Sequence, residues 1–275
     1  MITRIITGII GIAAAAFVIQ AGGDTFAGFT LVLMLAAWFE YDRAFAERGM
    51  GMATLTGFLA LALTWYAAWQ KPEFLALAWP LAVMVTLLES VLLRSSLNIV
   101  EALASGAGII YFGFPFTCMM LLRNILPDTQ FVTEIGDFSF GCAMVWIMFI
   151  GTWASDTFAY FTGTAWGRHK LCPSISPNKT VEGFMGALAG TTAAVAGLGY
   201  FLALPLQEMA VLGALIAIFA TLGDLVESVA KRYVGIKDSG SLIPGHGGVW
   251  DRFDSVLFTA PLVYYFVQFV NLAGK

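Results

Sequence analysis

Histidine and cysteine are scarce in this chain of 275 residues. It has two histidines, and its three cysteines, Cys118, Cys142 and Cys172, form no CxxC or CxxH motif. A structural zinc site or a disulfide framework is therefore not expected. With only two histidines, a metal site built from histidines or a hydrolytic triad is also not expected. Any metal must be held by oxygen ligands, which favours magnesium or a similar hard ion.

Charge is also scarce. Charged residues make up 12% of the chain, against roughly 25% in ordinary soluble domains. The hydrophobic fraction is 59% and the mean hydropathy is +0.82. Apolar runs of 17 or more residues recur along the chain, and such runs suit a hydrocarbon core of ~30 Å at 1.5 Å per helical residue. The composition predicts an all-α, polytopic membrane protein.

Counting apolar runs between breaks predicts about nine membrane-spanning helices. The first run could pass for a secretory signal, but it is long, and we expect it to be the first span. We see no internal repeat or linker, so we expect one transmembrane domain over 1–275, with scaffold-like spans in 1–137 and a catalytic half in 138–275. The predicted helices lie near 4–21, 25–41, 52–70, 74–94, 98–122, 138–162, 182–204, 207–232 and 252–272.

The lysines and arginines orient these spans. Eleven of the fourteen fall at one set of helix ends and loops, and only Lys71, Arg123 and Lys275 fall at the opposite set. This asymmetry is a strong positive-inside signal. It predicts a cytoplasmic N-terminus, cytoplasmic loops at 163–181 and 233–251, and a C-terminus on the opposite side of a cell (inner) membrane. The basic cytoplasmic face could attract anionic head groups or nucleotides.

Polar residues gather in two segments, 155–183 and 223–255. Together these hold both histidines, seven of the fourteen basic residues and seven of the eighteen acids. Asp224, Glu227, Ser228 and Lys231 follow the spacing i, i+3, i+4 and i+7, which places them on one face of a helix. A carboxylate as deep as Asp224 costs on the order of 2.5–3.5 kcal/mol to insert. We expect it to face a polar cavity, a cation or a basic partner.

Further carboxylates end or begin neighbouring spans. Asp251 and Asp254 open the last predicted helix at i and i+3, and Asp156 ends the sixth. Carboxylates from different helices that meet at one membrane face are what a magnesium site needs. These residues also have ordinary explanations. Asp156 could form a bond between helices, and Asp251 and Asp254 could interact favourably with the dipole of the last helix. Arg232 could be a membrane anchor. Their occurrence together on two adjacent helices favours a site.

Carboxylate-held magnesium with basic side chains and a glycine loop is suited to phosphates. No GxxxxGK[ST] motif is present, which argues against a Walker-type ATPase. Two segments also resemble the motifs of a known family. Residues 228–254, SVAKRYVGIKDSGSLIPGHGGVWDRFD, and residues 176–183, SPNKTVEG, resemble the signatures of the phosphatidate cytidylyltransferases (CDP-diacylglycerol synthases). The one departure is Ala230, where that family usually has a larger apolar residue.

The resemblance implies that CTP and phosphatidic acid react to give CDP-diacylglycerol and pyrophosphate. The nucleophile is an ionised lipid phosphate, so no strong general base is needed, and the task is to bring two polyanions together. The resemblance also implies a homodimer. The carboxylates predict a Mg²⁺ cofactor, with room for a second metal ion, and the basic residues predict an active site that faces the cytoplasm. No nucleic-acid partner is expected.

We assign roles as hypotheses. The proposed catalytic residues are Asp224, Asp251, Asp254 and Lys179. Metal ligation is assigned to Asp224 and Asp251, with Asp254 and Glu227 as further ligands or as residues that orient them. Glu182 is expected to orient Lys179. Substrate binding is assigned to Ser176, Lys179, Glu182, Ser228, Lys231, Arg232, Lys237, Asp238, His246, Gly247, Gly248 and Arg252.

Two alternatives stay open. A cation-coupled transporter could line an ion path with Asp156, Asp224 and Glu227, although these acids cluster at one face and not at the midplane. Another lipid phosphotransferase or prenyltransferase is the second alternative. The chain lacks the D-G-x-x-A-R motif of CDP-alcohol phosphotransferases, and Asp251 and Asp254 form only a DxxD. CTP consumption with pyrophosphate release distinguishes the three.

Overall fold

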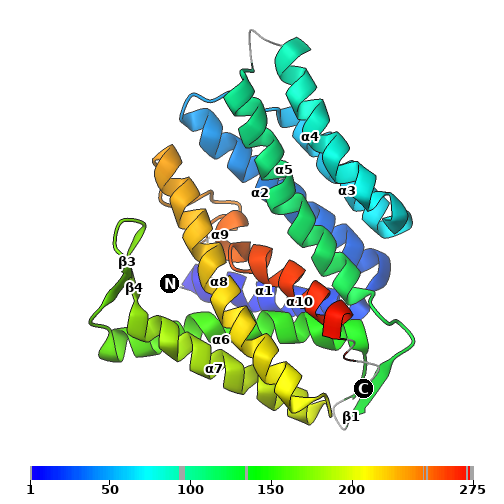
Figure 1. Ribbon diagram of the computed structural model, residues 1–275, viewed down its shortest axis with the longest axis vertical. Coiled ribbons are helices and arrows are strands. Elements are labelled where there is room, and N and C mark those ends of the chain that lie inside the picture. The colour runs from blue at the N-terminus through cyan, green and yellow to red at the C-terminus, as the bar shows by residue number, and fades with distance from the viewer. Residues whose placement is uncertain are drawn as a thin grey trace. The chain divides into compact units, whose positions relative to one another are not determined.

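The computed structural model describes residues 2–92, 97–133, 136–243, 245, 247–270 and 272. Helices dominate this part of the chain (Figure 1), and each of the nine predicted ranges contains one. The helices are α1 (Ile2–Ala21), α2 (Gly23–Glu47), α3 (Thr54–Gln70), a 3-10 turn (Pro72–Phe74), α4 (Leu75–Leu92), α5 (Ile99–Arg123), α6 (Phe140–Trp166), α7 (Val181–Phe201), α8 (Leu206–Val234), α9 (Trp250–Phe253) and α10 (Val256–Val270).

Six helical segments in the described residues are long and apolar enough to cross a membrane. They are Pro72–Leu92, Ile99–Arg123, Phe140–Trp166, Val181–Phe201, Leu206–Val234 and Trp250–Val270. An α-helix of 20 residues spans about 30 Å, so each reaches across a bilayer core. The chain is an all-α, multi-pass membrane protein, as its composition predicts. Helices α1 to α3 form where spans were predicted but are not among these six.

The last predicted helix is interrupted. Helix α9 ends at Phe253 and α10 begins at Val256, so Asp254 and Ser255 lie between two helices and not within one. The backbone N–H of Ser255 donates to Asp254 Oδ1 at 2.6 Å, and the carbonyl of Ser255 accepts the N–H of Thr259 at 3.1 Å. Because of this local turn, Asp251 and Asp254 do not share the uninterrupted helical face that their i, i+3 spacing predicts.

Two short hairpins join the helices. Strand β1 (Gln130–Thr133) pairs with β2 (Gly136–Ser139), and β3 (Lys170–Cys172) pairs with β4 (Ser176–Thr180), both antiparallel. Each hairpin leads directly into a helix. Ser139 Oγ accepts the N–H of Cys142 at the start of α6, and Thr180 Oγ1 accepts the N–H of Gly183 at the start of α7. These N-caps fix the point where each helix begins.

The chain divides into two compact units. The first comprises Met1–Leu121 and Ala230–Phe253, and the second comprises Leu122–Val229 and Asp254–Lys275. The chain passes from one unit to the other within α5, within α8 and at the Phe253–Asp254 peptide bond. The expected organisation as one transmembrane domain stays a prediction.

The core of the first unit surrounds Trp250, which is fully buried in α9. Its ring packs edge-on against Tyr41 of α2 and Phe112 of α5, with ring centroids 5.4 and 5.7 Å apart. The indole N–H of Trp250 donates to the hydroxyl of Tyr111 at 3.4 Å. Burial of aromatic rings supplies much of the packing energy of such a core, and here it fixes the short helix that carries Asp251.

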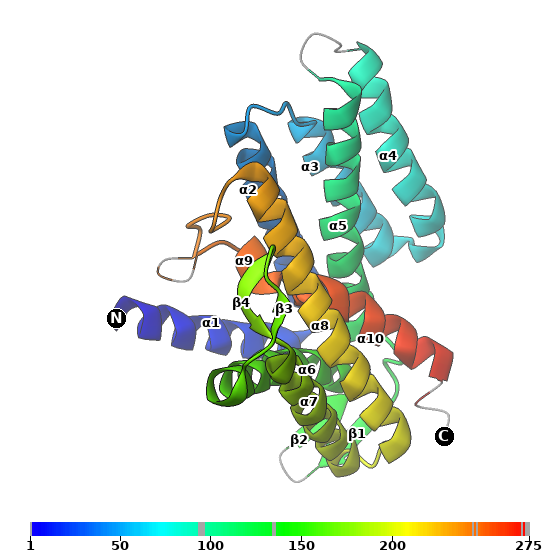
Figure 2. The ribbon, with the colours of Figure 1, turned by 60° about the vertical axis from the view of Figure 1, so that its left-hand side comes forward.

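In the second unit, α6 and α7 run side by side (Figures 1 and 2), with the β3–β4 hairpin between them along the chain. Helix α10 also packs on α6, where the buried hydroxyls of Thr152 and Thr259 lie 3.1 Å apart and share a hydrogen bond. This bond satisfies two polar groups that would be costly to bury alone. It ties the start of α10, just after Asp254, to α6.

Candidate functional site

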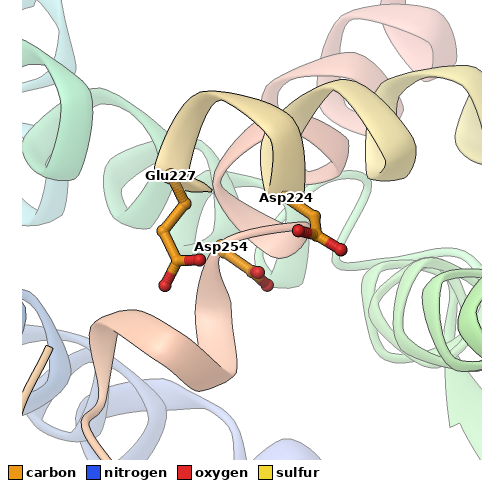
Figure 3. Close-up of side chains that lie close together, drawn as sticks. All are labelled: Asp224, Glu227 and Asp254. Atoms are coloured by element: carbon orange, nitrogen blue, oxygen red, sulfur yellow. The ribbon is translucent and has the colours of Figure 1, made fainter. Parts of the chain in front are cut away.

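Three carboxylates meet in the second unit (Figure 3). Asp224 and Glu227 extend from α8, one turn apart, and Asp254 extends from the turn before α10. One oxygen of each lies within 4.8 Å of the others. Glu227 is buried, and the other two are half-buried. Of the four predicted metal ligands, the structure brings these three together, and Asp251 belongs to the first unit.

A glycine allows Asp254 to approach α8 so closely. A Cβ atom on Gly223 would lie 2.5 Å from the backbone oxygen of Asp254 and 3.0 Å from Cα of Ser255. Any side chain here would push the turn away from the helix. The hydroxyl of Ser255 then donates to the backbone oxygen of Ala220 at 3.1 Å. These contacts hold the turn, and with it the third carboxylate, against α8.

Lys179 is the basic partner of this cluster. Its Nζ lies 2.8 Å from Oδ2 of Asp224, and both side chains are largely buried, with 22% and 33% of their surface exposed. The hydroxyl of Ser228 donates to Oδ1 of the same carboxylate at 3.4 Å. Lys179 is in strand β4, immediately before the N-cap of α7. The hairpin therefore positions the lysine, whose positive charge meets the carboxylate of Asp224.

A cavity of about 600 Å³ opens beside this ion pair. Its walls come from α6, the β3–β4 hairpin, α7 and α8, and they include Asp156, Tyr160, Asn178, Lys179 and Asp224. Cavities of this size suit small ligands. The sequence left the role of Asp156 open, and the structure places it in the wall of the cavity that Lys179 and Asp224 also line.

A second polar network occupies the first unit and centres on Asp251. Its Oδ1 lies 2.9 Å from Nζ of Lys231, and these two side chains are only 7% and 13% exposed. Its carboxylate also accepts the backbone N–H groups of Ser239, at 3.0 and 3.1 Å, and of Gly248, at 3.0 Å. Asp251 thus holds both Lys231 and the two ends of the 239–248 loop.

The remaining predicted residues lie in several environments. Ser176 begins β4, and Arg232, Lys237, Asp238 and Arg252 have exposed side chains in the first unit. Gly247 adopts a φ of 90°, in the left-handed region that favours glycine. His246 lies outside the described residues.

Glu182 was expected to orient Lys179. Its carboxylate accepts the backbone N–H groups of Arg168 and His169, at 3.1 and 3.2 Å, and pairs with Nδ1 of the His169 ring at 2.6 Å. Glu182 therefore holds the chain that leads into the hairpin. Because that hairpin carries Lys179, any effect of Glu182 on the lysine passes through the backbone.

Sequence reasoning missed Glu40. This residue of α2 is 2% exposed, and its carboxylate accepts backbone N–H groups of Val249 and Trp250. The sequence does contain one sign of a role for Glu40: it is an acid at the end of the apolar run 25–41, where an uncompensated carboxylate is costly. Its partners lie 199 to 210 residues away in the chain, so no local pattern reveals them.

The chemistry of the carboxylate cluster suits a hard divalent cation. Carboxylate oxygens are the ligands that Mg²⁺ and Ca²⁺ take, and at about 2.1 Å from Mg²⁺ opposite ligands are about 4.2 Å apart. Only one of the three pairs can be opposite, and adjacent ligands lie about 3.0 Å apart, so oxygens that lie within 4.8 Å of one another reach this geometry by rotation of their side chains. The residues Asp224, Glu227 and Asp254 therefore fit the metal that the sequence predicts.

The chain is similar to known proteins along nearly its whole length. A model of the "Cytidylyltransferase family" matches residues 2–270. The chain belongs to this family. Among curated relatives named phosphatidate cytidylyltransferase, that of Bacillus subtilis is 32% identical over 272 residues, which cover 95% of this chain and 96% of the relative. That of Synechocystis is 33% identical over 282 residues (96% and 95%), and that of Brucella abortus 34% over 274 residues (96% and 92%).

Membership of the cytidylyltransferase family agrees with the resemblance of the two motif segments. Segment 176–183 forms β4 and the start of α7, and it supplies Lys179. Segment 228–254 begins in α8 and ends at the turn before α10, and it supplies Lys231, Asp251 and Asp254. In this cytidylyltransferase-family chain, the motif residues thus take part in both polar networks, the one at Asp224 and the one at Asp251.

Proposed function

We propose that this chain transfers the cytidylyl group of CTP to phosphatidic acid, giving CDP-diacylglycerol and pyrophosphate for phospholipid biosynthesis. The observation that carries the proposal is the cluster of Asp224, Glu227 and Asp254 beside Lys179 in a multi-pass membrane protein. Family membership and relatives named phosphatidate cytidylyltransferase support the choice of substrates.

The reaction is an exchange of one phosphorus–oxygen bond for another. An oxygen of the lipid phosphate forms a bond to the α-phosphorus of CTP, and the bond from that phosphorus to the oxygen of the β-phosphate breaks. The bonding electrons leave with pyrophosphate. The lipid phosphate is already ionised at neutral pH, so no side chain has to remove a proton from it. The protein's task is to align two polyanions and offset their repulsion.

The side chains of the second unit suit this task. Lys179 is largely buried, and a cation there binds phosphate more strongly than it would in water. The adjacent cavity of about 600 Å³ is proposed to take the phosphate of the lipid. When bound by Asp224, Glu227 and Asp254, Mg²⁺ would offset the negative charge of the phosphates and help to align them. A second metal ion is compatible with this proposal, and Asp156 lines the same cavity.

Residues of the first unit are proposed to bind CTP. Lys231 is held by Asp251, while Arg232, Lys237 and Arg252 present exposed basic side chains that suit a triphosphate. Asp251 stays a predicted metal ligand, and its bonds to Lys231 and to two backbone N–H groups give it a positioning task as well. Asp238, His246, Gly247 and Gly248 are proposed to shape the nucleotide pocket, and Ser228, which belongs to the second unit, keeps its predicted role in substrate binding.

We also propose the topology that the basic residues predict. About nine spans would place the N-terminus and the site at the cytoplasmic face of the inner membrane, where CTP is available, and the C-terminus on the opposite side. The protein is expected to act as a homodimer. Protease accessibility or cysteine labelling of inverted and right-side-out vesicles tests this orientation at the 163–181 loop.

The proposed activity is tested with purified protein, CTP labelled at the α-phosphate, phosphatidic acid and magnesium. We expect label in the lipid fraction and one pyrophosphate per labelled lipid, with both lost on chelation. Release of labelled CMP without lipid labelling would instead indicate a different nucleotide reaction. Ion flux in vesicles without nucleotide would favour a transporter.

A further inference from the structure

Glu40 is a buried carboxylate to which neither the sequence motifs nor the proposed chemistry assigns a role. It extends from α2, 2% exposed, within the first unit. Its Oε1 accepts the N–H of Val249 at 3.0 Å, and its Oε2 accepts the N–H of Trp250 at 2.9 Å and the hydroxyl of Ser239 at 3.3 Å. A buried carboxylate is costly unless it is paired and hydrogen-bonded, so these donors define its place.

Glu40 and Asp251 hold the same piece of chain from two sides. Three consecutive backbone N–H groups are divided between them: Gly248 donates to Asp251, and Val249 and Trp250 donate to Glu40. Ser239 contacts both, with its N–H on Asp251 and its hydroxyl on Glu40. The position of the Asp251 carboxylate and its partner Lys231 therefore depends on a glutamate from a distant helix.

Two glycines make room for this carboxylate. A Cβ atom on Gly240 would lie 2.6 Å from Oε1 of Glu40, and one on Gly248 would lie 2.5 Å from its Oε2. Both distances are far shorter than any van der Waals contact. The backbone of the loop thus comes close to Glu40 at both ends of the loop. A loop that packed only on the surface of α2 would not need glycine at these two positions.

Glu40 and Gly240 also line a second cavity, of about 200 Å³. It lies between α2 and the loop, and Glu40, Asp238, Ser239 and Ser241 are among its lining residues. Its volume is enough for part of a nucleotide but not for a lipid. Asp238 is one of its lining residues, and Asp238 and the preceding Lys237 are both assigned above to CTP.

We propose that Glu40 is a positioning residue for the CTP half of the site. It acts through Ser239, Val249 and Trp250, which donate hydrogen bonds to it, and sets the affinity for CTP without touching the reacting atoms. This inference rests on the proposed function. It predicts a selective effect: loosening the segment weakens CTP binding and leaves the binding of phosphatidic acid unchanged.

The test is the Glu40→Gln variant of the full-length protein, compared with wild type in the labelled-CTP assay. A glutamine offers one carbonyl oxygen and turns an NH₂ group toward an N–H or hydroxyl donor, so at least one of the three bonds is lost. We expect the KM for CTP to rise about tenfold, while kcat stays within about threefold and the KM for phosphatidic acid is unchanged. Glu40→Asp, which keeps the charge, should give an intermediate KM.

Glu101→Gln is the matched control. Glu101 also accepts two backbone N–H groups, of Gly51 at 2.8 Å and Asn98 at 2.7 Å, in the same unit. Its loss should lower thermal stability without changing the KM for CTP. If Glu40→Gln behaves like this control, with less folded protein and an unaltered KM for CTP, Glu40 is merely structural and the inference is wrong.

A second readout does not depend on activity. Hydrogen exchange measured without substrates should be faster in Glu40→Gln at the amides of Val249 and Trp250, and unchanged in α7. If Glu40→Gln does not fold, Ser239→Ala is the deciding variant, because it removes one hydrogen bond to Glu40. A KM for CTP that rises about threefold supports the inference, and an unchanged KM for CTP overturns it. A wild-type protein that transfers no label contradicts the proposed function itself.

Discussion

Replacing Asp224 by asparagine separates a catalytic role for the carboxylate cluster from a structural one. Asp224 attracts Lys179, whose Nζ is 2.8 Å from its Oδ2, and it repels Glu227 and Asp254, whose oxygens lie within 4.8 Å. The variant keeps the size and shape of the side chain and removes its charge. Both the attraction and the repulsions therefore disappear together.

The magnitudes nearly cancel. At an effective dielectric constant of about 20, the attraction to Lys179 is worth about 6 kcal/mol, and each repulsion across 4.8 Å costs about 3.5 kcal/mol when the carboxylates are ionised. The variant loses about 6 kcal/mol of attraction and is relieved of about 7 kcal/mol of repulsion. Without a divalent cation, Asp224→Asn should thus be as stable as wild type or about 1 kcal/mol more stable.

Thermal unfolding of the detergent-purified proteins, with and without magnesium, measures this. Magnesium at 100 times its dissociation constant adds about 2.7 kcal/mol to wild type, which raises the Tm by roughly 5–10 °C for a chain of this size. Asp224→Asn should gain little from the same addition. In the transfer assay its kcat should fall by about 100-fold or more.

Two results would refute this reasoning. The first is a metal-free variant that unfolds well below wild type, because the carboxylate would then be a structural partner of Lys179. The second is a variant that keeps the full stabilisation by magnesium, because the ion would then bind elsewhere. Glu73→Gln, at an acid in the 3-10 turn before α4, is the control for loss of one negative charge.

Three further predictions concern single contacts. Lys179→Met should lower kcat/KM by about 10²–10³-fold, with partial recovery in Lys179→Arg, in steady-state kinetics at saturating magnesium; an effect under threefold would remove Lys179 from the site. Lys231→Met removes the cation that pairs with the carboxylate of Asp251, which is 7% exposed. The variant protein should be less stable than wild type by about 3–5 kcal/mol in chemical unfolding, and equal stability would contradict this. Gly223→Ala should cost about 1–3 kcal/mol because its Cβ would overlap the backbone at Asp254, whereas Gly197→Ala, with nothing within 4 Å, should be neutral; equal effects of the two would contradict the close approach.

Much of the fold could be predicted because hydrophobic runs determine it. Each predicted range contains a helix, and Asp224 and Glu227 lie one turn apart on α8 as their spacing indicates. That pairing is local, since it depends only on helical geometry. The same reasoning failed at the last predicted helix, where Asp254 and Ser255 form a turn and break the i, i+3 relation to Asp251.

The features that escaped prediction depend on contacts between distant segments. The β3–β4 hairpin positions Lys179, but its strands are only three and five residues long, and an isolated hairpin of that length has little pattern of its own. Glu40 escaped because its donors are 199 to 210 residues away. Gly223 appears in sequence as an ordinary helical glycine, and only the packing of the 254–255 turn shows why a side chain does not fit.

The most direct measurement of the central claim is transfer of label from α-labelled CTP into lipid, with wild type and Asp254→Asn side by side. Asp254 is the carboxylate that joins Asp224 and Glu227 from a separate segment. We predict labelled CDP-diacylglycerol with equimolar pyrophosphate for wild type, and a rate lower by at least about 100-fold for the variant at equal amounts of folded protein. Transfer by Asp254→Asn at the wild-type rate would contradict the account.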